Sequence, residues 1–315
     1  MSVDGSTPSQ PEPIIRVRDL VKRFDGRAVL DGVSLDVTPG QTLVIMGGSG
    51  CGKSTLLRCL IGSLRPEEGS IEMFGRDLCN LSEEGMDTVR KKFGILFQSG
   101  ALYNSMTVAE NVALPLSEHT DLDPQTIETI VTIKLEQVGL REHADKYPGQ
   151  ISGGMKKRAG LARAMALDPQ VLFYDEPSAG LDPVTSAEID QLIIGMTRGL
   201  GVTSIVVTHE MDSAFTIADR MVMLDKGRVL RADDRAWFEN LRALTEDEAR
   251  RRVDSGAMNE DEQLIRQFLR GDADGPITAR RSASSYADDL LRGRHPVNAP
   301  AVQSTKPVRK DEARP

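Results

Sequence analysis

The sequence predicts an α/β fold that is built on a mainly parallel β-sheet and interrupted by a helical subdomain. From Ile14 to about residue 230, short β-branched runs alternate with amphipathic or Ala/Leu-rich stretches, which is the pattern of a parallel sheet covered by helices. Between Thr107 and Ala166 the pattern changes, because the segment TIETIVTIKLEQVGL spaces its apolar residues three to four apart. With 315 residues, 39% of them hydrophobic, the chain can bury a large core without disulfides or metals.

The amino-terminal segment is predicted to be a disordered leader. Residues 1–13, MSVDGSTPSQPEP, are polar and contain three prolines. They lack a basic stretch followed by an apolar one, so they do not form a secretory signal, and we expect the protein to stay in the cytosol. No apolar run approaches the roughly 18 residues of a membrane-spanning helix. Any membrane role is therefore expected to come through a partner.

Composition excludes further classes of protein. The chain has three cysteines, Cys51, Cys59 and Cys79, which is an odd number, and no two of them have CxxC spacing. This argues against a disulfide framework or a zinc site and favours buried thiols. The net charge of −8 has the wrong sign for a protein that coats nucleic acid. We therefore expect no nucleic-acid partner, and phosphate chemistry that is local to one site.

The chain after the turn signal Asp225-Lys226-Gly227 is predicted to be helical rather than extended. Regular strand patterning stops there, and charged helical sequence continues to Gly271, so residues 233–271 form a helical carboxyl-terminal extension and 14–232 the preceding domain. The last predicted helix of this extension carries an apolar stripe and ends at Gly271, a candidate C-cap. Because of the stripe, this helix is expected to dock on another surface. The stripe consists of Leu264, Ile265, Phe268 and Leu269. Residues 272–315, rich in Arg, Ala, Ser and Pro, are predicted to be a disordered tail.

A glycine-rich loop follows the strand-like segment QTLVIM and precedes the helix-like LLRCLIG. Its sequence GGSGCGKST fits the phosphate-binding pattern G-x-x-x-x-G-K-S. Backbone N–H groups of such a loop wrap a phosphate, and the following helix directs its positive end at the anion. Lys53 would reach the β and γ phosphates, Ser54 would offer a hydroxyl to Mg²⁺, and Thr55 would lie near the α-phosphate. The predicted phosphate-binding residues are Gly47, Gly48, Ser49, Gly50, Cys51, Gly52, Lys53, Ser54 and Thr55.

An acidic pair, Asp175 and Glu176, ends the apolar strand VLFY. Ligands bind at the carboxyl ends of strands in α/β sheets, so Asp175 would hold Mg²⁺ through water and Glu176 would act as general base towards an attacking water. Without the glycine-rich loop, such a pair at the start of a loop would more often be structural. The two motifs together favour nucleotide hydrolysis.

A helix start at ISGGM carries an unusual set of charges. Lys156, Lys157 and Arg158 occupy its first turns, where cations oppose the helix dipole, so we expect an anion such as a γ-phosphate to arrive there. The alternative is an ordinary N-cap with a solvated basic face.

Six motifs in order resemble an ABC-type ATPase subunit over residues 14–230. They are the glycine-rich loop, Gln98 after FGILF, SGG, the DE pair, SAGLD and His209 after SIVVT. The resemblance implies a P-loop NTPase ABC-type nucleotide-binding domain that has a parallel-sheet core, an antiparallel β subdomain and an inserted helical subdomain at about residues 105–166. It also implies ATP as ligand, Mg²⁺ as cofactor, and a second copy of the chain paired head to tail.

The same resemblance assigns roles to individual residues. Ser152, Gly153 and Gly154 would contact the γ-phosphate across the dimer, Gln98 would sense Mg²⁺ and the water, and His209 would hold the γ-phosphate. Asp182 would tie the two sites together; because Pro183 follows it, Asp182 is also a predicted N-cap. Phe24 would stack on adenine, and core packing is the alternative. The family's signature reads LSGGQ, whereas here Ile151 and Met155 occupy its ends; we expect hydrolysis to survive the loss of the amide.

The stretches LFQSGALYNSMTVAENVALPL and SGGMKKRAGLARAMALDPQVLFYDEPSAGLDPV resemble the MlaF-like ATPases of Mla-type lipid transporters that work with MCE proteins. This implies a MlaE-type permease that contacts the stretch after Gln98, an MCE-domain lipid-binding protein, a small STAS-domain protein, phospholipid cargo, and a peripheral location at the cytoplasmic face of the inner membrane. The stripe at Leu264 would dock the second ATPase or the STAS-domain partner.

The alternative to lipid transport is an ABC transporter for another solute, such as an amino acid or a hydrophobic solvent, because the catalytic residues would be the same. ABC proteins that act on ribosomes carry two cassettes, and chromosome-organising ATPases need a long coiled coil. The chain has one cassette and no sustained heptads.

Overall fold

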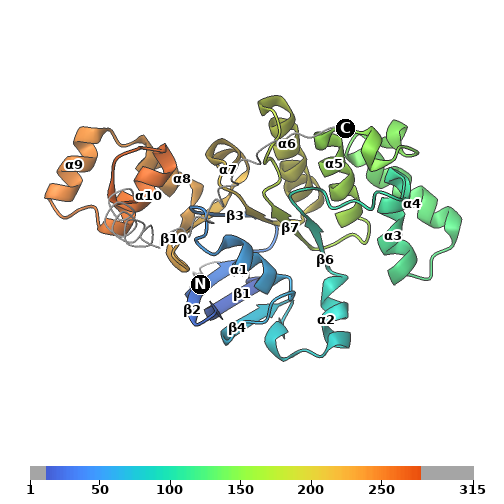
Figure 1. Ribbon diagram of the computed structural model, residues 1–315, viewed down its shortest axis with the longest axis horizontal. Coiled ribbons are helices and arrows are strands. Elements are labelled where there is room, and N and C mark those ends of the chain that lie inside the picture. Colours follow the sequence, from blue (N-terminus) through green and yellow to red (C-terminus); the bar gives the residue numbers. More distant parts are fainter. Residues whose placement is uncertain (1–11, 278–315) are drawn as a thin grey trace, which may run out of the picture.

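The computed structural model describes residues 12–277 (Figure 1). Most of the predicted leader and the predicted tail from residue 278 onwards lie outside the described residues. Within residues 12–277, no helix has the length and apolar character needed to cross a membrane.

A six-stranded sheet forms the centre of the molecule, with the order β10-β9-β3-β8-β7-β6. The pairs from β9 to β6 are parallel, and only the β10–β9 pair is antiparallel among the described strands of this sheet. Its strands are β3 (Thr42–Met46), β6 (Phe93–Leu96), β7 (Val171–Asp175), β8 (Thr203–Val207), β9 (Arg220–Asp225) and β10 (Arg228–Asp234). The predicted parallel core is therefore confirmed.

Strand β10 corrects one sequence-based expectation. Strand structure does not stop at Asp225-Lys226-Gly227, because β10 pairs with β9 from Arg228 to Asp234. As an edge strand β10 is partly or fully exposed along its length, so it shows no apolar alternation that a sequence pattern could reveal.

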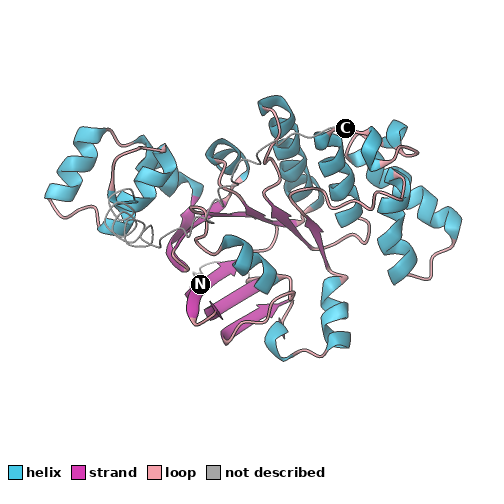
Figure 2. Cartoon of the chain, viewed as in Figure 1, coloured by secondary structure: helices cyan, strands magenta, loops and turns pink. Residues whose placement is uncertain are grey.

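A second sheet is antiparallel and has the order β2-β1-β4-β5. Its strands are β1 (Ile15–Phe24), β2 (Arg27–Val37), β4 (Glu68–Met73) and β5 (Arg76–Asp77). Helices α1 (Lys53–Leu60) and α2 (Glu83–Arg90) lie on the same side of the molecule, and a short 3₁₀ turn covers Leu78–Asn80 (Figure 2). The antiparallel β subdomain implied by the resemblance is confirmed.

Two hydrophobic cores occupy the two faces of the six-stranded sheet. Along β3, Val44 and Met46 belong to one core, whereas Leu43 and Ile45 belong to the other. This alternation follows from the two-residue period of a strand. The first core lies under helices α3 to α8 and the second under α1 and the antiparallel sheet, so β3 is buried on both faces.

The predicted helical subdomain consists of α3 (Val108–His119), α4 (Pro124–Gln137) and the start of α5 (Gly153–Ala164), with 3₁₀ turns at Arg141–His143 and Pro148–Gln150. A capping box between Thr107 and Glu110 begins α3. The fully buried Asn111 of α3 donates to the carbonyls of Tyr103, Met106 and Thr107, and thereby fixes the chain that enters the subdomain. Helices α6 (Pro183–Leu200) and α7 (Met211–Ile217) complete the layer (Figure 1).

The carboxyl-terminal extension contains α8 (Arg235–Ala243), α9 (Glu246–Asp254) and α10 (Glu260–Arg270). Gly271 ends α10 in a left-handed conformation, as predicted for a C-cap. Leu264, Ile265 and Leu269 are buried where α10 packs on α8 and β10. The stripe therefore docks, as expected, but on its own chain, so these three side chains are not free for a partner in this arrangement.

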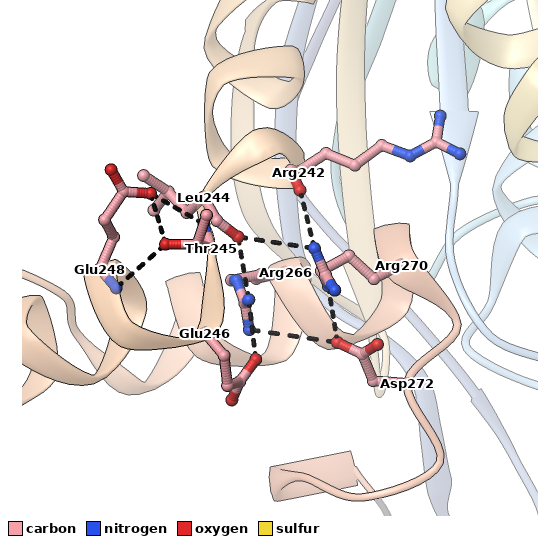
Figure 3. A network of polar contacts seen from close by, with 8 residues as sticks. All are labelled: Arg242, Leu244, Thr245, Glu246, Glu248, Arg266, Arg270 and Asp272. Carbon is pink, nitrogen blue, oxygen red and sulfur yellow. Dashed lines mark hydrogen bonds and ion pairs between the residues drawn. The ribbon is translucent and has the colours of Figure 1, made fainter.

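Two arginines of α10 bind the end of α8 (Figure 3). Arg266 donates to the Leu244 carbonyl and to Glu246 at 3.0 and 2.9 Å, while Arg270 binds Asp272 at 2.9 Å and reaches the same carbonyl at 3.5 Å. Cations are favourable at the negative end of a helix, so these contacts stabilise the α8–α10 pair. The chain remains in contact with α10 after Gly271, because the Ile277 amide donates to the Gln267 side chain at 2.7 Å.

All three cysteines are free thiols. Cys51 and Cys59 are buried as expected, and burial raises the pKa of Cys59 to about 11. Cys79 corrects the expectation, because it is only half-buried.

Candidate active site

The phosphate-binding loop joins β3 to α1, and its glycines are required by its path. Gly47 has φ 153°, and a Cβ there would lie 2.2 Å from the Leu224 carbonyl oxygen. Gly52 has φ 111°, and its Cβ would lie 2.7 Å from the Val29 carbonyl oxygen. Any side chain at either position would push the loop off β9 or β2, so the glycine pattern has a steric cause in both cases.

Lys53 begins α1 and folds back over the loop. Its ammonium donates to the carbonyls of Gly47 at 2.7 Å and Gly48 at 3.2 Å, and the side chain is buried. Within the described chain, no side chain caps the start of α1 and no acidic residue lies in its first turn. The helix start therefore offers unpaired N–H groups and a cation at the same place, which is the chemistry that binds phosphate.

The carboxyl ends of β7 and β8 bring Glu176 and His209 together. Glu176 Oε1 lies 2.9 Å from His209 Nδ1, and its Oε2 accepts from the His209 amide at 3.3 Å. Asp175 ends β7 beside them. Burial, and then the neighbouring Glu176, raise the pKa of Asp175, whereas Arg58 and Lys53 act in the opposite direction.

The other residues that are predicted to contact Mg²⁺ or adenine are exposed to solvent. Ser54 in α1 and Gln98 after β6 are both exposed, and Phe24 at the end of β1 is 45% exposed. The exposure of Phe24 rules out the core-packing alternative, and the Lys22 ammonium lies over its ring at 5.4 Å from the centroid. Across residues 12–277, no three His, Cys, Asp or Glu side chains cluster as a metal site.

The signature segment lies at the start of α5, away from the phosphate-binding loop in the sequence. Ser152 is the N-cap, accepting from the Met155 amide at 3.2 Å, and it is exposed together with Gly153. Gly154 is buried, and it packs so closely on α6 that a Cβ there would lie 2.4 Å from Thr185 Cγ2. The first two residues thus face outwards, and the third fixes the packing of α5 on α6.

The expectation that the cations of α5 await a phosphate is wrong for two of the three. Lys157 is buried, and its ammonium donates to the carbonyls of Pro177 and Ala179 at 2.6 and 2.7 Å. Arg158 pairs with Glu188 of α6 at 2.9 Å. Both charges are satisfied inside the chain, so only Lys156 remains of the predicted basic cluster.

Asp182 is the N-cap of α6, and Pro183 is at N1, as the sequence predicted. Its carboxylate accepts from the amides of Val184 and Thr185 at 3.1 Å each and from the Thr185 hydroxyl at 2.6 Å. These bonds, that of the hydroxyl first, hold the pKa of Asp182 below its usual value.

The structure gives two cations of α5 contacts that the sequence analysis did not predict. Arg163 donates to the carbonyls of Ala101 and Gly100 at 2.7 and 3.1 Å and so binds the loop that carries Gln98. Lys157 binds the loop that follows Glu176 at the other end of the helix. The available signal was a cation within the Ala-rich segment AGLARAMAL, since a charge on a packed face needs a partner.

Comparison with known proteins gives concordant matches. Residues 30–179 match the ABC transporter family model. The intermembrane phospholipid transport system ATP-binding protein MlaF of Escherichia coli K12 is 40% identical to this chain, and the match covers 89% of this chain and 97% of MlaF. The MlaF of Haemophilus influenzae is 39% identical, and the match covers 88% of this chain and 98% of that MlaF. The probable ribonucleotide transport ATP-binding protein mkl of Mycobacterium leprae is 39% identical over 93% of this chain and 80% of that one.

Two solved structures of ATP-binding cassette proteins have folds similar to that of this chain. A dimeric ATP-binding cassette, MJ0796, in a post-hydrolysis state with ADP and phosphate has a TM-score of 0.65 and 29% identity, over 70% of this chain and 98% of that one. The cbiO1 protein of Clostridium perfringens, part of an ABC transporter complex, has a TM-score of 0.68 and 30% identity, over 78% and 95%. With its phosphate-binding loop, its acidic pair and these relatives, the chain belongs to the ATP-binding ATPase subunits of ABC transporters.

Proposed function

We propose that this chain hydrolyses ATP to power phospholipid transport between membranes. The observation that carries the proposal is the identity of 39–40% to the MlaF proteins, which extends over 97–98% of their length. That range is longer than the catalytic cassette alone, so the similarity extends beyond the residues that would bind and hydrolyse ATP. The proposed partners are a MlaE-type permease, an MCE-domain lipid-binding protein and a small STAS-domain protein.

ATP would lie between the phosphate-binding loop and Phe24. The uncapped start of α1 and the Lys53 ammonium support binding of the phosphates, and the exposed Phe24 ring supports stacking on adenine. A second copy would close the site, because Ser152 and Gly153 are exposed on α5 and accessible to a phosphate that another chain holds. The proposed assembly is a head-to-tail dimer in which Asp182 lies near the subunit contact.

Ser54, Gln98 and Asp175 would hold Mg²⁺. Their hydroxyl, amide and carboxylate oxygens are the hard ligands that Mg²⁺ prefers. When bound, the ion would neutralise phosphate charge. Glu176 would accept the proton of the attacking water, and His209 orients the Glu176 carboxylate through the 2.9 Å contact and would reach the γ-phosphate.

The permease would contact a groove beside the loop that carries Gln98. This groove has a volume of about 460 Å³, and Phe97, Pro115, Arg163 and Leu167 are among the residues that line it. Phe97 is 40% exposed there, so the groove offers an apolar side chain to a partner. A helix of a membrane protein that fills this groove would place the chain peripherally at the cytoplasmic face of the inner membrane.

The proposal is tested by purifying the intact chain from its native membranes in mild detergent and identifying the bound proteins and lipids by mass spectrometry. The purified complex is then placed in vesicles that contain a fluorescent phospholipid, and ATP-dependent transfer of this lipid is measured, with Glu176→Gln as the inactive control. We expect a MlaE-like permease, an MCE protein and transfer by the wild type alone. Recovery of a different permease, with ATPase activity that is stimulated by a ribonucleotide or an amino acid but not by lipid, would contradict the phospholipid assignment.

A further inference from the structure

The loop after Glu176 is held by a buried lysine that belongs to a different part of the fold. Lys157 lies in the second turn of α5, five residues after the N-cap Ser152, and is 5% exposed. Its ammonium donates to the carbonyls of Pro177 at 2.6 Å, Ala179 at 2.7 Å and Glu176 at 3.4 Å. All three acceptors are backbone oxygens, so the ammonium fixes the path of the chain rather than the rotamer of one side chain.

The backbone at this point needs such support. Glu176 has φ 49°, in the left-handed region that residues with a side chain rarely adopt. Its carboxylate reaches His209 only because the chain turns sharply there. Burial lowers the pKa of Lys157, while the facing carboxylates of Glu210 and Glu176 raise it.

Helix α5 also holds the loop on its other side. Arg163 binds the carbonyls of Gly100 and Ala101, and Gly100 lies so close to α5 that a Cβ on it would be 2.7 Å from the Lys156 carbonyl oxygen. The loop that carries Gln98 and the loop that carries Glu176 are therefore both attached to the helix that begins with the signature residues.

We propose that Lys157 is a positioning residue for hydrolysis, which links the signature helix to the backbone of Glu176. A phosphate that binds at Ser152 and Gly153 would move α5, and Lys157 would transmit this movement to the carboxylate that activates water. Lys157 acts through the backbone carbonyls of Glu176, Pro177 and Ala179. The inference rests on the proposed role of Glu176 as the base.

The test compares full-length variants in the membrane complex that copurifies with the chain. Lys157→Met keeps the length of the side chain and removes its donors, and Lys157→Arg keeps a cation. Lys134→Met is the matched control, because Lys134 of α4 is also a buried lysine, and its partner is Asp168 rather than a loop of the site. For each variant we measure kcat, the KM for ATP and the melting temperature. We expect Lys157→Met to lower kcat by roughly 10- to 100-fold with KM nearly unchanged, as for a small displacement of a reacting group.

Lys157→Arg should recover most of the lost turnover, and Lys134→Met should keep the turnover of the wild type. Equal turnover of Lys157→Met and wild type, or a KM that rises in step with the fall in kcat, would overturn the inference. If Lys157→Met does not fold, Lys157→Gln replaces it. Its shorter side chain keeps two N–H donors, so we expect a smaller fall in kcat with KM unchanged, and a kcat equal to that of the wild type would overturn the inference. Glu176→Gln separates the two proposals. If Glu176→Gln keeps full turnover, the proposed role of Glu176 as base is wrong. If Glu176→Gln loses turnover and Lys157→Met does not, only the proposed role of Lys157 is wrong.

Discussion

Replacement of Gly154 by alanine should push α5, the helix that begins with the signature residues, away from α6. The new Cβ would lie 2.4 Å from Thr185 Cγ2, whereas non-bonded carbons pack at about 3.5–4.0 Å, so a shift of about 1 Å is required. Thr185 cannot rotate away freely, because its hydroxyl donates to Asp182 at 2.6 Å. The alanine keeps the backbone N–H of residue 154, so any effect comes from the packing of α5 on α6.

The structure sets the size of the effect. Overpacking of this kind lowers the free energy of unfolding by about 1–3 kcal/mol. A displacement of about 1 Å at residues that position a phosphate reduces turnover on the order of 10²-fold, even where nothing in the chemistry has changed. We therefore expect Gly154→Ala to fold with a lower melting temperature and to lose most of its ATPase activity.

Thr185→Ser provides the matched compensation, since it removes the Cγ2 methyl and keeps the hydroxyl that binds Asp182. Steady-state phosphate release and thermal unfolding are measured for wild type, both single variants and the double variant. Thr185→Ser should be nearly neutral alone and should restore both activity and stability to Gly154→Ala. A double variant as impaired as Gly154→Ala would refute the steric reasoning, and so would a fully active Gly154→Ala.

Three further changes test other parts of the site. Glu176→Gln should lower turnover by at least about 10²-fold and leave ATP binding intact, as measured by phosphate release and by nucleotide titration. Phe24→Ala should raise the KM for ATP about tenfold, since stacking of a base on an aromatic ring contributes about 1–3 kcal/mol, while Phe24→Trp should not. Asp190 is buried beside Ser213, and burial raises its pKa, so the stability that depends on its protonated form is lost as pH rises. Asp190→Asn should therefore melt about 2 °C above wild type at about pH 7, with a difference that shrinks towards about pH 4; the same difference at both values would contradict this.

The phosphate-binding loop and the acidic pair could be predicted from sequence because each depends on a local pattern at a strand end. The glycines at 47 and 52 encode the path of the loop, and Pro183 marks the helix that Asp182 caps. Strand β10 could not be predicted, because an exposed edge strand carries no apolar alternation. The partners of Lys157 also escaped prediction, since its three acceptor carbonyls lie 19 to 22 residues further along the chain and carry no side-chain signal.

The burial of β3 determines how rigid the phosphate-binding loop is before nucleotide arrives. All five residues of β3 are buried, and it pairs with β8 on one side and β9 on the other. The amide hydrogens of such a strand exchange with solvent only when the whole domain opens. A loop attached to this strand samples few conformations, so little conformational entropy remains to be lost when phosphate binds. The nucleotide's binding energy is then available to bring two subunits together rather than to order the loop.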